Sequence, residues 1–129
     1  MSQKEKGWVM EILLIIGKVL FGALFVGSGI SHFRALDFMT NYATYKKIPF
    51  ARFGVIVSGA AIIVAPILFL FGVFEAASLI VLALFLGATA VLFHNHWTIE
   101  DDQAKMNEQI AFNKNVSLLG AVLVILALL

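Results

Sequence analysis

Residues 12–33 read ILLIIGKVLFGALFVGSGISHF, and this stretch decides the fold. Lys18 is its only Lys, Arg, Asp or Glu. A helix needs about 20 mainly apolar residues to cross a hydrocarbon core about 30 Å thick. The stretch is long enough for that and carries almost no charge. It therefore predicts a transmembrane helix.

The rest of the chain has the same character, because 61% of its 129 residues are hydrophobic and 13% are charged. Ordinary soluble domains are about 45–50% apolar and about 25% charged, so too few charged side chains are present to cover a water-exposed surface. A net charge of +1 argues against nucleic acid as a partner. The chain has no cysteine, which excludes disulfides and thiolate metal sites within it. The expected partner is the lipid bilayer.

Three further apolar blocks follow the first, at residues 53–73, 76–93 and 112–129. Each has about the length of one membrane crossing. We predict one all-α membrane domain over residues 1–129, a bundle of four transmembrane helices with a long first loop and a polar third loop. The stretch 35–47 in the first loop has the composition of a short interfacial helix.

Four spans place both termini on one side of the membrane, and the first and third loops on the other side. That loop side collects most of the polar and ionisable side chains, namely His32, Asp37, Tyr42, Tyr45, His94, His96, Glu100, Asp101, Asp102, Asn113, Lys114 and Asn115. The tail side has only the N-terminal tail and the short turn around Glu75. We therefore expect the functional site on the loop side.

One face of the first span combines small and ionisable residues. Its members follow the spacing i, i+4, i+7, i+11 and i+14, and they are Lys18, Gly22, Phe25, Gly29 and His32. Gly22, Ser28 and Gly29 are expected packing residues, because small side chains let a neighbouring helix approach. Charge facing lipid is costly, so Lys18 should point into the bundle. The alternative is that Lys18 extends to the tail-side interface.

The histidines raise the question of a metal or a cofactor. His94 and His96 are two apart, so on a helix they would point to nearly opposite faces, and we expect no metal site. A haem between His32 and His94 is geometrically possible, because we expect both to lie at the same depth in parallel helices, but interfacial histidines are more often polar anchors, and we do not expect one. A quinone is the more natural cofactor, because its flat head group can enter from lipid and exchange protons with histidine and carboxylate groups. The ligand-binding candidates are Lys18, His32, His94, Lys114 and Asn115, and no catalytic residue is identified.

Three blocks of residues occur in a characteristic order. They are Gly17-Lys18 with Leu24–Phe33, the loop ending at Pro49, and Phe93-His94-Asn95-His96-Trp97 followed by Gln109, Phe112, Lys114, Asn115 and Leu118-Leu119-Gly120. With these blocks the chain, from about Gly17 to its end, resembles the DoxX-like family of small four-helix membrane proteins. It departs from the family in two places: Lys18 stands where an arginine is frequent, and Ser58 and Gly59 stand where many relatives have an acidic residue.

This resemblance implies a subunit of a quinone-linked redox system in the plasma (inner) membrane, of the thiosulfate to quinone type, acting with a redox protein partner. Whether the chain is itself an oxidoreductase stays open. The alternative is a non-catalytic membrane partner or assembly protein whose small-residue face and polar loops dock other membrane proteins, and the absence of any cofactor motif favours it. Apolar surfaces do not distinguish a homo-oligomer from a complex with another protein.

The distribution of lysine and arginine predicts the orientation. The loop side carries Arg34, Lys46, Lys47, Arg52, Lys105 and Lys114, against Lys4 and Lys6 on the tail side. Because basic residues accumulate on the cytoplasmic side of membrane proteins, we expect cytoplasmic loops and external termini.

Overall fold

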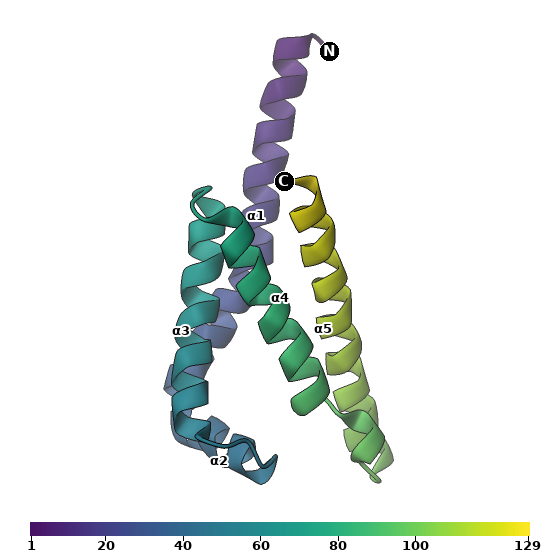
Figure 1. Ribbon diagram of the computed structural model, residues 1–129. Helices are drawn as coiled ribbons and strands as arrows, with labels where there is room; N and C mark the ends of the chain where they lie inside the picture. Colours follow the sequence, from purple (N-terminus) through teal and green to yellow (C-terminus); the bar gives the residue numbers. More distant parts are fainter.

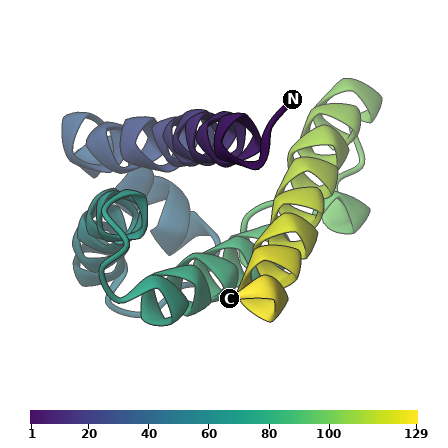
Figure 2. The ribbon, with the colours of Figure 1, turned by 90° about the horizontal axis from the view of Figure 1, so that it is seen from above.

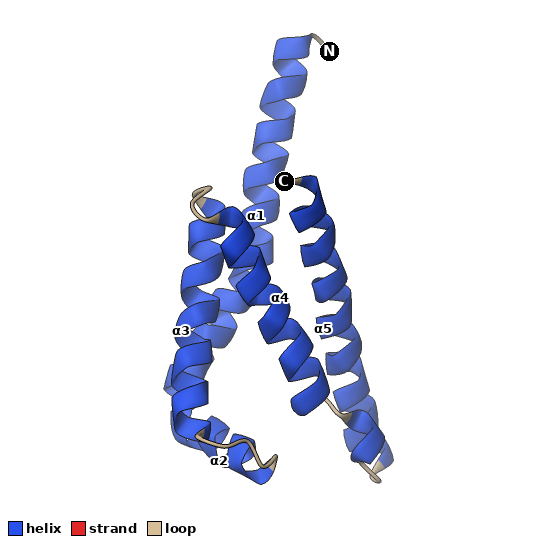
Figure 3. Ribbon diagram, in the orientation of Figure 1, coloured by secondary structure: helices blue, strands red, loops and turns tan.

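The computed structural model describes residues 1–129 and confirms an all-α protein without strands (Figures 1 and 3). The elements in chain order are α1 (Gln3–Arg34), α2 (Leu36–Tyr45), α3 (Ala51–Leu70), α4 (Glu75–Leu92), the 3₁₀ turn η1 (His96–Thr98) and α5 (Asp102–Leu128). Four of these segments, namely α1, α3, α4 together with η1, and α5, are long and apolar enough to cross a membrane. They correspond to the four predicted spans.

Two of the helices begin well before the predicted apolar spans. At α1 the Ser2 hydroxyl accepts a hydrogen bond from the backbone N–H of Glu5, and the Glu5 carboxylate accepts one from the Ser2 N–H. At α5 the Asp101 carboxylate accepts a hydrogen bond of 2.8 Å from the Ala104 N–H. Such caps satisfy backbone donors that the first helical turn leaves unpaired. Polar residues can therefore extend both helices beyond the apolar blocks.

The long helices form an open row in the order α1, α3, α4, α5. Each helix packs against the next, while α1 and α5 do not pack directly against each other. Figure 2 shows α1 and α5 as the two ends of this row. Only 17 of the 129 residues are buried, and large apolar side chains are exposed on all four long helices. Exposed apolar side chains are expected on a protein whose solvent is lipid.

A small core joins the row at its centre. Its members are Phe25, Ile62, Ala65, Phe69, Leu79, Leu82, Leu86 and Val122, contributed by α1, α3, α4 and α5. Because all four helices supply at least one core residue, this cluster fixes the row as a single unit.

Helix α1 packs against α3, and Gly22, Phe25 and Gly29 are the buried residues of α1. A Cβ atom on Gly29 would lie 2.8 Å from the carbonyl oxygen of Gly59, so the two backbones meet directly there. Ser28, also expected at this contact, is half-buried. The glycines therefore set the distance between the two helices.

Helix α2 is the short helix predicted in the first loop. It lies across the loop-side end of the row (Figure 1) and packs mainly against α3, where Ala43 is buried. An ion pair of 3.0 Å between Arg52 and Asp37 ties its first turn to the start of α3. Gly59 of α3 lies against His32, close to the end of α1, so the start of α3 extends further toward the loop side than α1 does.

Candidate functional site

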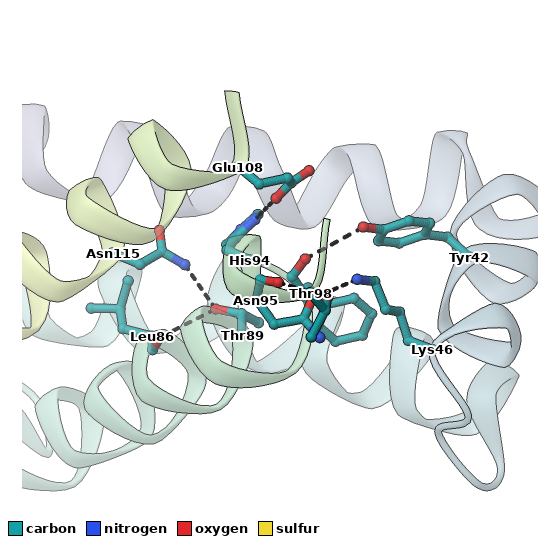
Figure 4. Close-up of polar contacts among 10 residues, drawn as sticks. Tyr42, Lys46, Leu86, Thr89, His94, Asn95, Thr98, Glu108 and Asn115 are labelled. Carbon is teal, nitrogen blue, oxygen red and sulfur yellow. Dashed lines mark hydrogen bonds and ion pairs between the residues drawn. The ribbon is translucent and has the colours of Figure 1, made fainter. Parts of the chain in front are cut away.

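The third connection folds back against the end of α4. The backbone N–H groups of Phe93 and His94 both donate to the carbonyl oxygen of Thr89, at 2.9 and 3.1 Å. The chain then enters η1, which packs against α5. This path brings His94 and Asn95 between α5 on one side and α2 on the other (Figure 4).

His94 pairs with Glu108, a residue that the sequence analysis did not single out. The Nδ1 atom of His94 lies 2.7 Å from Oε2 of Glu108, and the two side chains are 27% and 28% exposed. Either the imidazolium or the neutral Nδ1–H tautomer donates this hydrogen bond. In the neutral tautomer Nε2 is an acceptor, so it can exchange a proton while Nδ1 keeps the ring oriented.

Asn115 lies further along α5 than Glu108, away from the loop-side end, and is only 6% exposed. Its amide Nδ2 donates to the hydroxyl of Thr89 at 2.9 Å, and that hydroxyl donates to the Phe85 carbonyl oxygen at 2.8 Å. This chain of hydrogen bonds gives the Asn115 amide N–H and the Thr89 hydroxyl partners within the protein, and it joins α5 to α4 (Figure 4). Thr89 was not predicted, because a threonine in a span is inconspicuous when its hydroxyl bonds its own helix.

Tyr42 and Lys46 fasten α2 to the third connection. The Tyr42 hydroxyl donates to the Phe93 carbonyl oxygen at 3.4 Å, and the Lys46 ammonium donates to the amide oxygen of Asn95. Burial raises the pKa of Tyr42 above its usual value, and the negative charge of Glu108 raises it further. The carboxylate that pairs with His94 therefore also acts on Tyr42, so these side chains form one electrostatic unit.

His32 does not join this unit. Its Nδ1 atom lies 2.7 Å from the Ser28 carbonyl oxygen, and its ring centre lies 6.1 Å from that of Phe85. Phe85 and His94 are nine positions apart, which corresponds to roughly 13 Å along a helix. The expectation of equal depth for His32 and His94 is therefore wrong. The cause is that α1 already ends at Arg34, where the chain turns into α2, whereas α4 and the third connection continue further toward the loop side.

The remaining candidates are separate as well. Lys114 is exposed and forms no hydrogen bond or ion pair with another side chain. Lys18 lies near the tail-side turn, where its ammonium is 3.3 Å from Oε1 of Glu75 and 4.6 Å from the centre of the Phe69 ring. Glu75, at the start of α4, thus supplies a carboxylate for Lys18 although the second span has none.

The two neighbouring histidines of the third connection have different surroundings. While His94 meets Glu108, the ring of His96 packs edge-on against Trp97 and Phe112, each with a centre distance of 5.3 Å. No group of three or more His, Asp or Glu side chains is close enough together to hold a metal ion. The chemistry that this arrangement offers is proton exchange and hydrogen bonding.

Comparison with known proteins gives one informative likeness. The chain is 26% identical over 119 residues to the inner membrane protein YphA of Escherichia coli (strain K12), an alignment that covers 92% of this chain and 84% of that protein. No protein-family model matches the chain, and no solved structure matches it. Together with four helices of membrane-spanning length, the likeness shows that the chain is an integral protein of the plasma (inner) membrane.

Proposed function

We propose that the chain is a membrane subunit of a quinone-linked redox system in which His94 and Glu108 exchange protons with the quinone head group. The observation that carries this proposal is the 2.7 Å contact between His94 Nδ1 and Glu108 Oε2 at the loop-side end of α4 and α5. A titratable, partly exposed pair at the edge of an otherwise apolar protein has access to both lipid and water. Those are the two phases between which quinone chemistry takes place.

The chemistry explains why such a pair is suited to the task. Reduction of a quinone to a quinol consumes two electrons and two protons. In the proposal a redox protein partner supplies the electrons, and His94 transfers protons from water to the quinone oxygens through Nε2. Glu108 stabilises the imidazolium that forms when His94 takes up a proton, and it holds the ring in place. The reverse sequence applies if the quinol is oxidised.

Asn115, two helical turns from Glu108 on the same face of α5, provides a further hydrogen-bonding group. Its Nδ2 is engaged by Thr89, whereas its carbonyl oxygen accepts no hydrogen bond within the chain. That oxygen can accept a hydrogen bond from a quinol hydroxyl. In the proposal Asn115 and His94 contact different parts of one head group at the loop-side ends of α4 and α5.

The residue blocks around His94 and Asn115 support a DoxX-like assignment, and the likeness to an inner membrane protein agrees with it. On this basis we infer that the redox system is of the thiosulfate to quinone type. The partner that oxidises the sulfur compound is a separate protein in this proposal, since the chain has no cysteine and therefore no thiol to attack sulfur.

Binding of a short-chain ubiquinone analogue to the purified chain in lipid nanodiscs tests the proposal. We expect saturable binding that weakens on the order of tenfold in both variants, because His94→Ala removes the group that contacts the head group and Glu108→Gln removes the charge that stabilises the His94 imidazolium. The matched control is Asn107→Ala, an exposed neighbour of Glu108 on α5. Absence of saturable binding, or equal weakening in all three variants, would refute the assignment.

A second candidate is a non-catalytic membrane partner, and α1 favours it. Every residue of α1 up to Gly17 is exposed, and Figure 1 shows this part of the helix extending beyond the end of α5. A photo-crosslinker at Leu13 should then give one discrete protein adduct in native membranes, whereas one at the exposed Val64 on α3 should give only lipid adducts. Lipid adducts at both positions would argue against a partner on α1.

A further inference from the structure

The loop side of the molecule is divided into two regions of opposite charge. Residues 34–53 contain four cations, Arg34, Lys46, Lys47 and Arg52, and one acid, Asp37, so their net charge is 4 − 1 = +3. Residues 94–115 contain the acids Glu100, Asp101, Asp102 and Glu108 and the cations Lys105 and Lys114, so their net charge is 2 − 4 = −2. The positive region is built by the end of α1, by α2 and by the connection to α3.

Aromatic side chains are exposed in the same positive region. Phe38 and Tyr45 are seven positions apart and share one face of α2, where they are 73% and 77% exposed, and Phe50 in the connection to α3 is 85% exposed. The opposite face of α2 is occupied by the contact of Ala43 with α3. Aromatic residues at the ends of membrane spans are typical of the headgroup level. If these three aromatic side chains faced water, they would form an unfavourable exposed apolar patch.

The orientation of α2 suits a position at the membrane surface. The helix lies across the ends of the spans (Figure 1), and it is held there by Arg52 at its first turn and by Tyr42 and Lys46 at its last turn. Asp37 is engaged by Arg52, which leaves Arg34 and Lys47 exposed and without an acidic partner. Two uncompensated cations thus lie next to an exposed aromatic face.

We propose that α2 and its connection to α3 form a docking surface for the headgroups of anionic phospholipids. Phe38, Tyr45 and Phe50 enter the boundary between headgroups and acyl chains, and Arg34 and Lys47 contact the phosphates. An acidic protein would match the charge but would leave the aromatic side chains without an apolar environment. A lipid surface satisfies both at once, and it is already present at the ends of the spans. The proposal does not depend on the quinone site.

Native mass spectrometry of the full chain, titrated with phosphatidylglycerol or phosphatidylcholine of identical acyl chains, tests this surface. We expect a preference for phosphatidylglycerol in the unmodified protein. The double variant Arg34→Gln/Lys47→Gln should lose roughly 25-fold in affinity for that lipid, because each cation near an anionic membrane surface contributes about a factor of five. The matched control, Lys4→Gln/Lys6→Gln, removes the same charge from the tail side and should retain the preference.

Each outcome of this comparison decides the question. Equal losses in the two double variants would show that net charge alone attracts the lipid, and an unmodified protein without any preference would equally overturn the proposal. Binding of a poly-glutamate peptide to the protein, undiminished by added phosphatidylglycerol, would point to an acidic protein as the partner instead. Far-UV circular dichroism of each variant verifies that its helices are intact. The variant Phe38→Ala/Tyr45→Ala should bind both lipids more weakly, and unchanged binding would contradict the role of the aromatic face.

Discussion

Lys18 shows how a single charged side chain is accommodated in a membrane-spanning helix. Its side chain is only 11% exposed, and its ammonium lies between the carboxylate of Glu75 and the ring face of Phe69. An ammonium away from water is stabilised by an opposite charge and by the negative face of an aromatic ring. Lys18 thus meets an acidic partner at the tail-side turn.

This contact predicts strong coupling between two positions 57 residues apart in the sequence. Lys18→Met or Glu75→Gln alone should lower the free energy of unfolding by about 3 kcal/mol, because each leaves a partly buried charge without its partner. The double variant Lys18→Met/Glu75→Gln should cost clearly less than the sum of the two single changes. Thermal unfolding in detergent measures the three values. Simple additivity would show that the pair contributes no coupling.

The site was predictable from the sequence only in part, for reasons visible in its residues. His94 and Asn115 stand out because each lies at the loop-side end of an apolar block, where the sequence gathers its polar side chains. Glu108 was missed because it lies in a polar stretch among other acids. The spacing along α5 could have identified Glu108. Glu108, Asn115 and Val122 follow one another at intervals of seven residues, so Glu108 shares the face of α5 on which Asn115 and Val122 are buried.

At the scale of elements, the contact between α1 and α3 depends on glycine. A Cβ atom at Gly29 would overlap the side chain of Ile63 and approach the Gly59 carbonyl oxygen to 2.8 Å, whereas one at Gly27 would meet nothing within 4 Å. The two positions lie on the same helix, two residues apart and on different faces. Alanine substitution at each of the two positions therefore separates the effect of helix packing from the effect of helix propensity.

Gly29→Ala should destabilise the protein by about 1–3 kcal/mol, since a backbone carbonyl cannot move aside as a side chain can. Gly27→Ala should leave stability unchanged or raise it by up to about 1 kcal/mol, because alanine is the better helix former. Both values follow from thermal unfolding in detergent. Equal effects of the two substitutions would contradict the close approach of α1 and α3.

The elements themselves follow largely from the sequence, but their relative heights do not. Apolar length predicts the four spans, and the composition of residues 35–47 predicts α2. Residue spacing identifies the packed face of α1 but contains no information on how far α1 slides along α3. His32 consequently lies beside Gly59, well inside α3, and not at the level of His94.

At the scale of the whole molecule, the polar side chains fall on one side of an open row of helices. The row leaves α1 and α5 without a direct mutual contact, so both keep large lipid-facing surfaces. The sequence could not distinguish this open row from a closed bundle, because surfaces that face lipid and surfaces that face protein have similar composition. The separation of the polar loop side from the tail side was predictable, since it requires only the number of spans.

The orientation of this polar side in the membrane is the remaining property of the whole molecule, and the absence of cysteine makes it accessible to labelling. The excess of lysine and arginine on the loop side predicts that the loops are cytoplasmic. A membrane-impermeant maleimide should therefore label Gln3→Cys on intact cells, and Asn41→Cys only after permeabilisation. The lipid-facing control Val64→Cys should stay unlabelled in both states. The reverse pattern would place His94 and Glu108 on the external side, so that a quinone bound there would exchange its protons with the outside.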